Sequence, residues 1–337
     1  MNVAIVYSLP SKRMMATPYG ETDEDSRIIA EKVAIALAAN KMNPRIYAIA
    51  EDRIDQILEI RADVIFNLIE WCGLDTHLSQ KAFANFATLE IPITGSCEEV
   101  FVMTGDKAMM KGVLQKYGFP TPKGIFFETG DEKVEIELIY PVIVKPATEH
   151  CSTGLSYDSI AHDELELRTI AKHQIAKFHQ PAIAEEFIQG RELLVYLLED
   201  KDDVRVLPIE EVVFSNQNPL AFQTYESKWV TTHPDYQTSE VVVAQLSKGE
   251  QKTIEETSRA IFKKLGFGGY ARFDVRLKDG VPYMLETNAN PSVYDGDGSL
   301  SDPNEEVIPG IKFRDYILKI VEAARKGDKL YVNDSSI

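Results

Sequence analysis

Cysteine is scarce in this sequence, and its scarcity limits the structures that the chain can adopt. The 337 residues include three cysteines, Cys72, Cys97 and Cys151, which are odd in number and far apart. This pattern argues against a disulfide framework or a zinc cluster and is typical of a reducing cytoplasm. The six histidines show no metal-ligand spacing either. A metal site built from nitrogen and sulfur ligands is therefore not expected.

Positive charge is also in short supply. Asp and Glu number 53 against 36 Lys and Arg, which gives a formal net charge of −17. Such a chain lacks the electrostatic footprint for nucleic acid or an anionic membrane, although a few lysines and a metal ion can still bind a nucleotide. No run of roughly 18 or more apolar residues exists, and the opening MNVAIVYSLP does not resemble a signal peptide. We expect a cytoplasmic protein without membrane or nucleic-acid partners.

The sequence does contain enough apolar residues, 44%, to build two or three compact units. Residues 1–96 alternate strands with helices, which is the pattern of a parallel α/β domain. The elements expected there are strands at Val3–Ser8, Arg45–Ile49, Asp63–Leu68 and Ile93–Ser96, and helices at Asp25–Asn40 and Ile54–Ile60.

A second unit is expected at residues 97–182, a third at 183–325, and a polar tail at 326–337. In the second unit, Thr104 or Asp106 can cap a helix that runs to Tyr117. The other elements expected are strands at Pro141–Lys145, Gly154–Tyr157, Ile183–Phe187 and Leu193–Leu198, and helices at Glu250–Leu265 and Phe313–Ala324.

The most informative stretch is Ala271–Asn290, which reads as two antiparallel strands joined at Asp279-Gly280. Arg272 and Asp274 share one face of the first strand. Folding the hairpin sets Glu286 opposite or diagonal to them. Asn288 lies two residues further on and shares the face of Glu286 if the chain stays extended.

Two carboxylates and an amide, Asp274, Glu286 and Asn288, make a hard oxygen site. Such a site suits Mg²⁺ or Mn²⁺ that bridges phosphate oxygens. The alternative is a surface hairpin whose charged side chains simply face water. Arg272 favours the functional interpretation, because a site that stabilises a transferring phosphoryl group uses a cation beside its acids.

Three further segments can bind a nucleotide, although each has a plainer explanation. Lys145 ends an apolar strand and precedes the loop ATEHCSTG, which can clamp phosphates, but strand-end lysines are usually just solvated. Lys107 in the first turn of a helix opposes the helix dipole, so an anionic ligand there would explain it. The segment Ala184–Glu192 can offer a backbone edge to adenine and a carboxylate to ribose, or can be a plain strand and turn.

Taken in order, these stretches resemble the ATP-grasp carboxylate–amine ligases, and among them the D-alanine–D-alanine ligases. The resemblance covers roughly Asn2–Arg325. It implies an α/β fold in which a parallel N-terminal domain precedes a two-subdomain ATP-grasp unit of α+β type, with ATP between two antiparallel sheets. The stretches that carry it are FNLIE, PITGS, PVIVKPATEHCSTG, EEFIQGRE, YESKW and GYARFDVRLKDGVPYMLETNANPS.

The resemblance also implies roles for individual residues. ATP would be bound through its phosphates, its adenine and its ribose by Lys107, Lys145, Lys228, Glu185, the backbone of Phe187 and Ile188, and Glu192. Two Mg²⁺ ions, or Mn²⁺, would be bound by Asp274, Glu286 and Asn288. Arg272, Lys228 and Ser152 would act in catalysis. The first substrate would meet residues from a loosely aligned set, namely Glu24, Ser26, Ser292, Ser299 and Leu300.

The implied reaction has two steps. A substrate carboxylate attacks the γ-phosphate to give an acyl phosphate and ADP, and an amine then attacks the acyl group and releases phosphate. Amino acids or peptides would be the substrates, in a homodimeric enzyme, with peptidoglycan biosynthesis as the setting if the product is D-alanyl-D-alanine. A ligase for another amino-acid pair, a small-molecule kinase and a nucleotide binder without catalysis are the alternatives.

Some residues depart from the D-alanine pattern. The loop that is glycine-serine-serine in those enzymes is His150-Cys151-Ser152 here, and the tyrosine expected after the loop lysine is Trp229. Ser292 replaces a glycine, and Val293–Leu300 is longer than its counterpart. The resemblance therefore supports ATP chemistry more strongly than it supports D-alanine as the substrate.

Overall fold

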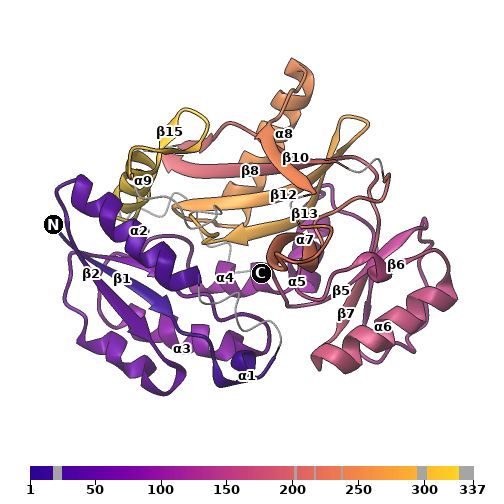
Figure 1. The fold of residues 1–337 in the computed structure, drawn as a ribbon, viewed down its shortest axis with the longest axis horizontal. Helices are drawn as coiled ribbons and strands as arrows, with labels where there is room; N and C mark the ends of the chain where they lie inside the picture. The colour runs from indigo at the N-terminus through magenta and orange to yellow at the C-terminus, as the bar shows by residue number, and fades with distance from the viewer. Residues whose placement is uncertain (18–24, 201–202, 216–217, 237, 294–301, 326–337) are drawn as a thin grey trace.

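The computed structural model describes residues 1–17, 25–200, 203–215, 218–236, 238–293 and 302–325 (Figure 1). Three sheets organise this part of the chain: one of three strands, one of four and one of six. A short β14–β15 hairpin, Glu306–Ile308 and Ile311–Lys312, lies outside them. None of the helices in the described ranges is long and apolar enough to cross a membrane.

The N-terminal sheet is parallel, as the sequence predicts, and its strand order is β2-β1-β3. Its strands are β1 Asn2–Ser8, β2 Asn43–Ile49 and β3 Val64–Leu68. One face packs on α2 (Asp25–Ala39) and on the C-terminal helix α9 (Phe313–Arg325). The other packs on η2 (Glu51–Glu59) and α3 (Thr76–Ala87).

Two local predictions for this unit have different outcomes. The helix expected at Ile54–Ile60 is present as the 3-10 helix η2, which begins earlier, at Glu51, and is kinked at Arg53. The strand expected at Ile93–Ser96 is reduced to one parallel bridge between Ile93 and Ile65. The remaining short helices of this region are α1 (Lys12–Met15) and η3 (Gly73–Asp75).

The central sheet is antiparallel, with order β4-β7-β5-β6 and helix α6 (Glu164–Phe178) packed on it. Its strands are β4 Gly124–Phe127, β5 Val142–Pro146, β6 Ile160–Ala161 and β7 Ala182–Glu186. The strand expected at Gly154–Tyr157 is wrong, because that segment is a turn followed by η4 (Tyr157–Ser159). Leu155 donates a backbone hydrogen bond to Ser152, and Gly154 has a φ of +77°, which bends the chain before it reaches β6.

The sheet memberships also shift the expected boundary between the second and third units. A boundary after Ala182 would cut β7, which is bonded to both β4 and β5. The division consistent with the sheets falls in the linker between Glu186 and Arg191. We propose units at 1–96, 97–186 and 191–325.

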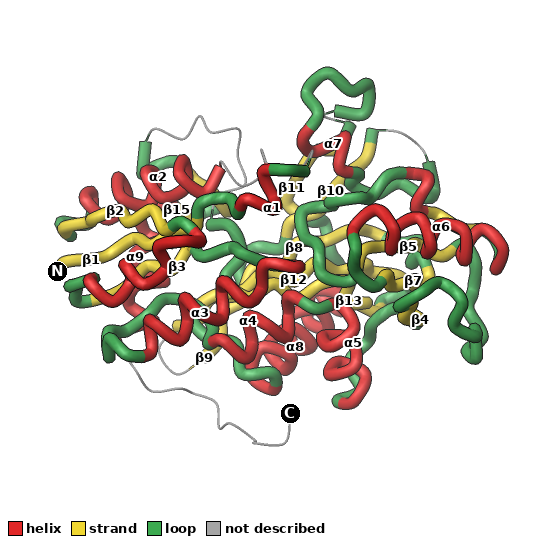
Figure 2. Tube along the Cα trace, turned by 90° about the horizontal axis from the view of Figure 1, so that it is seen from below, coloured by secondary structure: helices red, strands yellow, loops and turns green. Residues whose placement is uncertain are grey.

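The six-stranded sheet is antiparallel, with order β11-β10-β8-β12-β13, and β9 also pairs with β8. Helices α4 (Glu98–Gly105), α5 (Lys107–Lys116) and α8 (Lys248–Lys264) cover one face and share a core with it (Figure 2). Helix α5 thus packs on this sheet although its sequence lies in the second unit. The strands are β8 Arg191–Asp200, β9 Asp203–Val206, β10 Glu210–Phe214, β11 Ser239–Val243, β12 Tyr270–Lys278 and β13 Val281–Ala289.

Alternation along β12 divides this sheet into a structural face and a chemical face. Phe273, Val275 and Leu277 point into the core with α4, α5 and α8. Tyr270 points the other way, into the core that α9 shares with the N-terminal sheet. The residues that follow Tyr270 on the same face of β12 are charged, so this part of the sheet presents polar side chains and does not pack in a core.

Candidate active site

The β12–β13 hairpin brings the expected acid and amide side chains together. Asp274 is the direct cross-strand partner of Glu286, and Arg272 is the partner of Asn288. Cross-strand partners point to the same face of a sheet. All four side chains therefore lie together on the face away from the α5–α8 core, as the sequence predicts.

A β-bulge makes this arrangement possible. Lys278 pairs with Val281 at the turn, and a regular register from there would set Leu285 opposite Asp274. The register instead shifts after Asp274, so that Leu285 has no partner and Glu286 takes its place. Without the extra residue, Glu286 would point to the opposite face. The signal in the sequence is the break in alternation at Met284-Leu285, where two apolar residues are adjacent. Pairing the residues by counting back from the turn misses this signal.

The two carboxylates of the hairpin have different electrostatic surroundings. The Nε of Arg272 lies 2.9 Å from Oδ1 of Asp274, and Asn288 donates to Oδ2 at 3.4 Å. Burial raises the pKa of Asp274 despite the arginine. Burial also acts to raise the pKa of Glu286, but Lys107, with its Nζ 3.3 Å from Oε1, leads the charges that lower it to about 2.

Lys107 ties the start of α5 to the loop after β5. Asp106 caps the helix by accepting from the amides of Ala108 and Met109, so of the two capping residues expected, Thr104 and Asp106, it is the second that acts. The backbone N–H of Lys107 donates to Ala147 at 3.0 Å, and its ammonium donates to the carbonyl of Glu149. Its side chain is 5% exposed, so the lysine is held inside the site.

A second lysine of α5, Lys111, belongs to the site and is missed by the sequence reasoning. Its Nζ lies 2.9 Å from Oε1 of Glu185, while Lys145 lies 3.1 Å from Oε2. Lys111 also donates to Thr121 at 2.9 Å. The available signal is spacing, because residues four apart on a helix share a face and Lys107 is one turn earlier.

The carboxylate of Glu185 is engaged by lysines, and its contact with the adenine stays a prediction. Its side chain is 1% exposed, and both carboxylate oxygens face lysines. Burial acts to raise the pKa of Glu185, but Lys111 and Lys145 lower it below its ordinary value. In this structure Glu185 orients the two lysines, and the cluster of one acid and two ammonium groups is left with a positive excess.

The loop after Lys145 is bound to the segment that carries Lys228. Ser152 donates its hydroxyl to the carbonyl of Gln223 at 2.8 Å, and the indole of Trp229 donates to the carbonyl of Cys151 at 3.0 Å. Helix α7, Tyr225–Trp229, holds Lys228 close enough to Asp274 to act on the pKa of that carboxyl. The structure therefore brings Ser152 and Lys228 to the same site.

His150 lies in the same loop, close to Lys107 and Arg272. Burial lowers the pKa of His150 to about 4, and the charges of Lys107 and Arg272 add to that effect. The imidazole is therefore neutral at pH 7.

The expected nucleobase side of the site is apolar. Phe187 and Tyr157 both contact the ring of Phe222 edge-on, at centroid distances of 6.0 and 5.4 Å. The backbone N–H of Phe187 donates to Pro141 at 3.0 Å. Ile188, 8% exposed, follows in the linker, and its N–H bonds to none of the residues that the structure describes. Ile188 is thus the better placed of the two for reading a base edge.

The residues expected to bind the first substrate are only partly covered. Ser26 is buried in the first turn of α2 and donates to Oε2 of Glu70 at 3.1 Å. Ser292 is half-buried directly after β13. The remaining three, Glu24, Ser299 and Leu300, lie outside the described residues.

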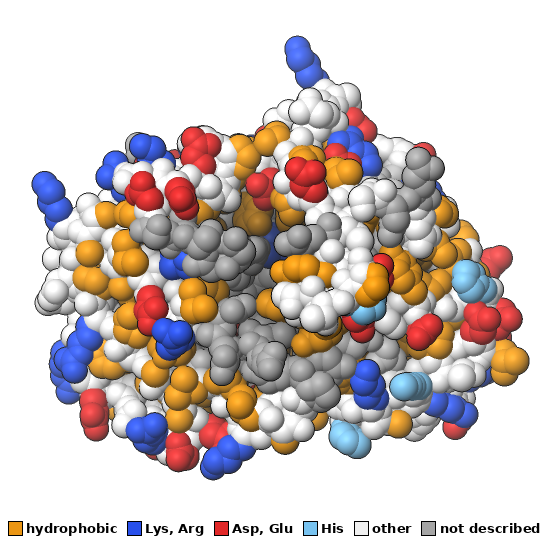
Figure 3. Space-filling model, in the orientation of Figure 1, with side chains coloured by type: hydrophobic (Ala, Val, Ile, Leu, Met, Phe, Trp, Pro, Cys, Tyr) orange, Lys and Arg blue, Asp and Glu red, His pale blue; other side chains and the backbone are white. Residues whose placement is uncertain are grey.

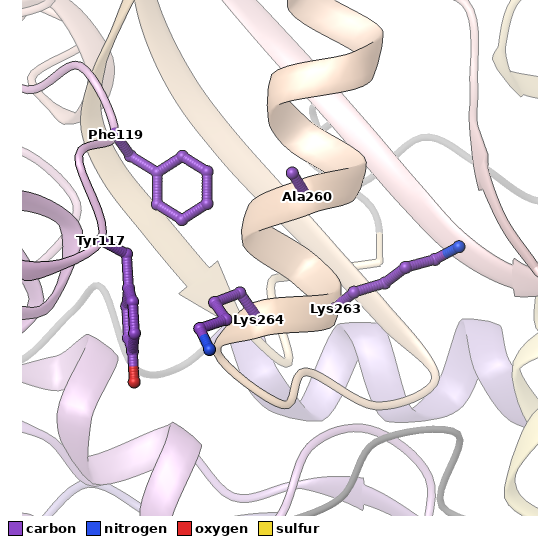
Figure 4. A pocket seen from close by; sticks show the side chains of 5 residues that line it. All are labelled: Tyr117, Phe119, Ala260, Lys263 and Lys264. Atoms are coloured by element: carbon purple, nitrogen blue, oxygen red, sulfur yellow. The ribbon is translucent and has the colours of Figure 1, made fainter. Parts of the chain in front are cut away.

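The site lies on a hollowed face of the molecule. Figure 3 shows a hollow near the middle of this face, with Lys or Arg side chains at its depth. A separate groove of about 460 Å³ lies between the end of α5 and α8 (Figure 4). That groove is lined by none of the expected site residues, its lining being Tyr117, Phe119, Ala260, Lys263 and Lys264. We assign it no part in nucleotide binding.

The fold and sequence match proteins of one family. The structure superposes on an ATP complex of D-alanine–D-alanine ligase from Bacillus anthracis with a TM-score of 0.71 and 19% identity, over 97% of this chain and 98% of that one. It also matches a D-Ala:D-Ser ligase from Enterococcus faecalis with a TM-score of 0.69 and 18% identity, over 96% and 99% of the two chains. These likenesses confirm the expected ATP-grasp fold of α/β class.

Sequence relatives give a consistent result. The chain is 30% identical to the D-alanine–D-alanine ligase of Cupriavidus necator over 239 residues, 70% of this chain and 68% of that protein. It is 32% identical to an uncharacterised protein of Sinorhizobium fredii over 232 residues, 68% of this chain and 66% of that protein. The alignments thus span about two thirds of these relatives.

The family model described as the D-Ala D-Ala ligase C-terminus matches residues 114–322. This match contains Lys145, Glu185, the linker and the whole hairpin, while Lys107 and Lys111 precede it. The chain therefore belongs to the D-alanine–D-alanine ligase family of ATP-dependent carboxylate–amine ligases.

Proposed function

We propose that this protein joins two amino acids through an amide bond, using ATP to activate the carboxylate of the first. D-Alanine is the first candidate for both substrates. The observation that carries the proposal is the group of buried and half-buried cations beside the bulged hairpin. In a chain of net charge −17, the site has more cations than carboxylates, which suits a polyphosphate. The members of this group are Lys107, Lys111, Lys145, Lys228 and Arg272, facing Glu185, Asp274 and Glu286.

The hairpin residues fit a divalent cation by the chemistry of their donors. Asp274 and Glu286 offer carboxylate oxygens on one face, and Asn288 can offer an amide oxygen. Within the described residues, no group of three or more His, Cys, Asp and Glu side chains converges, so the amide is a necessary member. We propose that these residues hold two Mg²⁺ ions, or Mn²⁺, which would neutralise charge on the phosphates.

The side chains of this protein would act mainly by position and charge. Lys107 and Lys145 would contact phosphate oxygens, and Lys111 would hold Glu185 so that Lys145 stays oriented. Arg272 would stabilise the charge that develops on the acyl phosphate and on the tetrahedral adduct. His150, neutral at pH 7, adds no charge to this set.

Exclusion of water is the other requirement, because an acyl phosphate hydrolyses when water reaches it. The bonds from Ser152 to Gln223 and from Trp229 to Cys151 hold the loop after β5 against the segment that carries Lys228. These bonds would close the site around the nucleotide. Ser152 would therefore act by holding the loop.

The experiment that tests the proposal is phosphate release by the purified protein with ATP, Mg²⁺ and D-alanine. We expect release that depends on the amino acid, and loss of that release in Arg272→Ala. Release no greater than in a protein-free control would sink D-alanine as the substrate. Nucleotide binding measured alongside would tell whether the ATP site itself is absent.

A ligase for a different pair of amino acids is the second candidate. The observation that favours it is the contact between Trp229 and Cys151, two residues that replace the expected tyrosine and serine. The same assay with other D- and L-amino acids distinguishes the two candidates. We further propose a cytoplasmic homodimer, which light scattering after size-exclusion chromatography tests.

A further inference from the structure

Arg276 lies in the hairpin but has no part in the function proposed above. It follows Asp274 on the same face of β12, and its side chain is 6% exposed. A buried guanidinium is costly unless its donors are satisfied. Its partners therefore indicate what it holds in place.

Three hydrogen bonds join Arg276 to separate parts of the chain. Its Nη2 donates to Oε2 of Glu192 at 2.6 Å and to the carbonyl of Ala221 at 2.8 Å. Its Nη1 donates to the carbonyl of Gly190 at 3.0 Å. The guanidinium carbon also lies 5.2 Å from the centroid of the Phe187 ring, within the range of a cation–π contact.

These partners surround the nucleobase side of the site. Phe187 and Gly190 lie in the linker between the two antiparallel sheets, and Glu192 is the second residue of β8, directly after the linker. Ala221 precedes Phe222, whose ring contacts that of Phe187. The linker runs against β12 so closely that a Cβ at Gly190 would come within 2.4 Å of the carbonyl oxygen of Leu277.

Glu192 is the acid that this arrangement leaves ready to bind a ligand. Arg276 engages Oε2, and Oε1 bonds to none of the residues that the structure describes. A lone glutamate would lose rotamer freedom on binding, which reduces affinity, whereas an acid already held in place does not. The ribose of a nucleotide supplies hydroxyl donors for such a carboxylate.

We propose that Arg276 is a positioning residue for the nucleotide, which fixes Glu192 toward the ribose hydroxyls. The proposal rests on ATP binding at this site. It makes the ribose hydroxyls, rather than the phosphates, the part of the nucleotide that Arg276 acts on.

The test is the binding of ATP and of 2′,3′-dideoxy-ATP by calorimetry, with Mg²⁺ present. Wild type should prefer ATP, since a hydrogen bond to a charged group contributes about 1.5–3 kcal/mol, or about tenfold or more in affinity. Arg276→Met should lose most of that preference, because its affinity for ATP falls while its affinity for the dideoxy nucleotide stays nearly unchanged. Glu192→Gln should do the same.

Arg191→Met is the matched control. It breaks an arginine–carboxylate pair of the same sheet, with Glu211 at 2.6 Å, and leaves Glu192 and Ala221 untouched. This variant should keep the wild-type preference for ATP. An Arg276→Met protein that weakens both nucleotides equally would overturn the proposal, and so would a wild type that binds both equally well.

A double variant distinguishes an effect of Arg276 on folding from an effect on the positioning of the nucleotide. Arg276→Met leaves Glu192 buried without its partner, which is destabilising. Arg276→Met with Glu192→Gln removes that charge, so it should fold and bind both nucleotides alike. If it retains the wild-type preference, the positioning role is overturned. If wild type binds neither nucleotide, the proposed function itself fails.

Discussion

Replacing Glu286 by Gln separates the two tasks that the structure gives this residue. Its carboxylate balances the charge of Lys107, 3.3 Å away, and it stands opposite Asp274 in the proposed metal site. Glutamine keeps the shape of the side chain and removes the charge. The variant should therefore be less stable without ligands and should be almost inactive with them.

The size of the stability loss follows from the pKa of Glu286. Burial acts to raise that pKa, but Lys107 and other nearby charges lower it from 4.5 to about 2. At about 1.4 kcal/mol per pKa unit, this drop corresponds to roughly 3 kcal/mol, and the partial exposure of the carboxylate makes about 2–3 kcal/mol the expectation. Such a loss lowers the Tm by about 5–10 °C in a unit of 150–250 residues.

The same shift fixes the pH dependence of the loss. Because the folded pKa of Glu286 lies below the unfolded value, its contribution is fully present above pH 4.5 and disappears as the pH falls toward 2. The difference in Tm between wild type and Glu286→Gln should therefore narrow below pH 4.5. Thermal unfolding without nucleotide or metal measures it.

Turnover is measured on the same preparation as ADP release, and it should fall by about 100-fold or more. Glu211→Gln is the control, because it breaks the pair with Arg191 in the same sheet but lies outside the site. That variant should lose stability and keep turnover. A Glu286→Gln protein with turnover within about tenfold of wild type would refute the reasoning.

Three further predictions follow from the site. Lys111→Met should destabilise the protein, because it breaks the buried pair with Glu185. Breaking a buried pair costs about 3–5 kcal/mol, and we expect the low end of that range because Lys145 still faces Glu185. An unchanged Tm would contradict this prediction. His150 takes up a proton near pH 6.5 when unfolded but only near pH 4 when folded, so its contribution to stability is lost as the pH falls from 6.5 to 4. The Tm of ligand-free wild type should fall more steeply over that range than that of His150→Asn, and parallel curves would count against this. Arg272→Lys should lower kcat by about 100-fold and leave the affinity for ATP nearly unchanged, as ADP release and calorimetry would show.

The sequence predicts the hairpin site well because its signals are local. Alternation in β12 and the turn at Asp279-Gly280 place Arg272 and Asp274 on one face. The bulge at Leu285 was not predicted, although the conclusion depends on it. A bulge is set by how the flanking side chains pack on both faces, and the hydrophobic alternation of the sequence indicates it only weakly.

Long-range pairing determines the contacts that the sequence does not predict. Glu185 faces lysines from α5 and β5 that are 74 and 40 positions away. The bond from Arg276 to the carbonyl of Ala221 spans 55 positions. Such pairs form when separate units pack together, and no local propensity encodes them. The same applies to β7, which joins the central sheet by pairing with β4 and β5.

The measurement that tests the central claim most directly is the ratio of phosphate released to amide formed. Purified protein would be supplied with ATP, Mg²⁺ and single or paired D- and L-amino acids, and the products identified by mass spectrometry. The account predicts one amide for each phosphate released, with no turnover when the amino acids are omitted. A stable phosphorylated substrate without amide, or phosphate release that needs no amine, would contradict it.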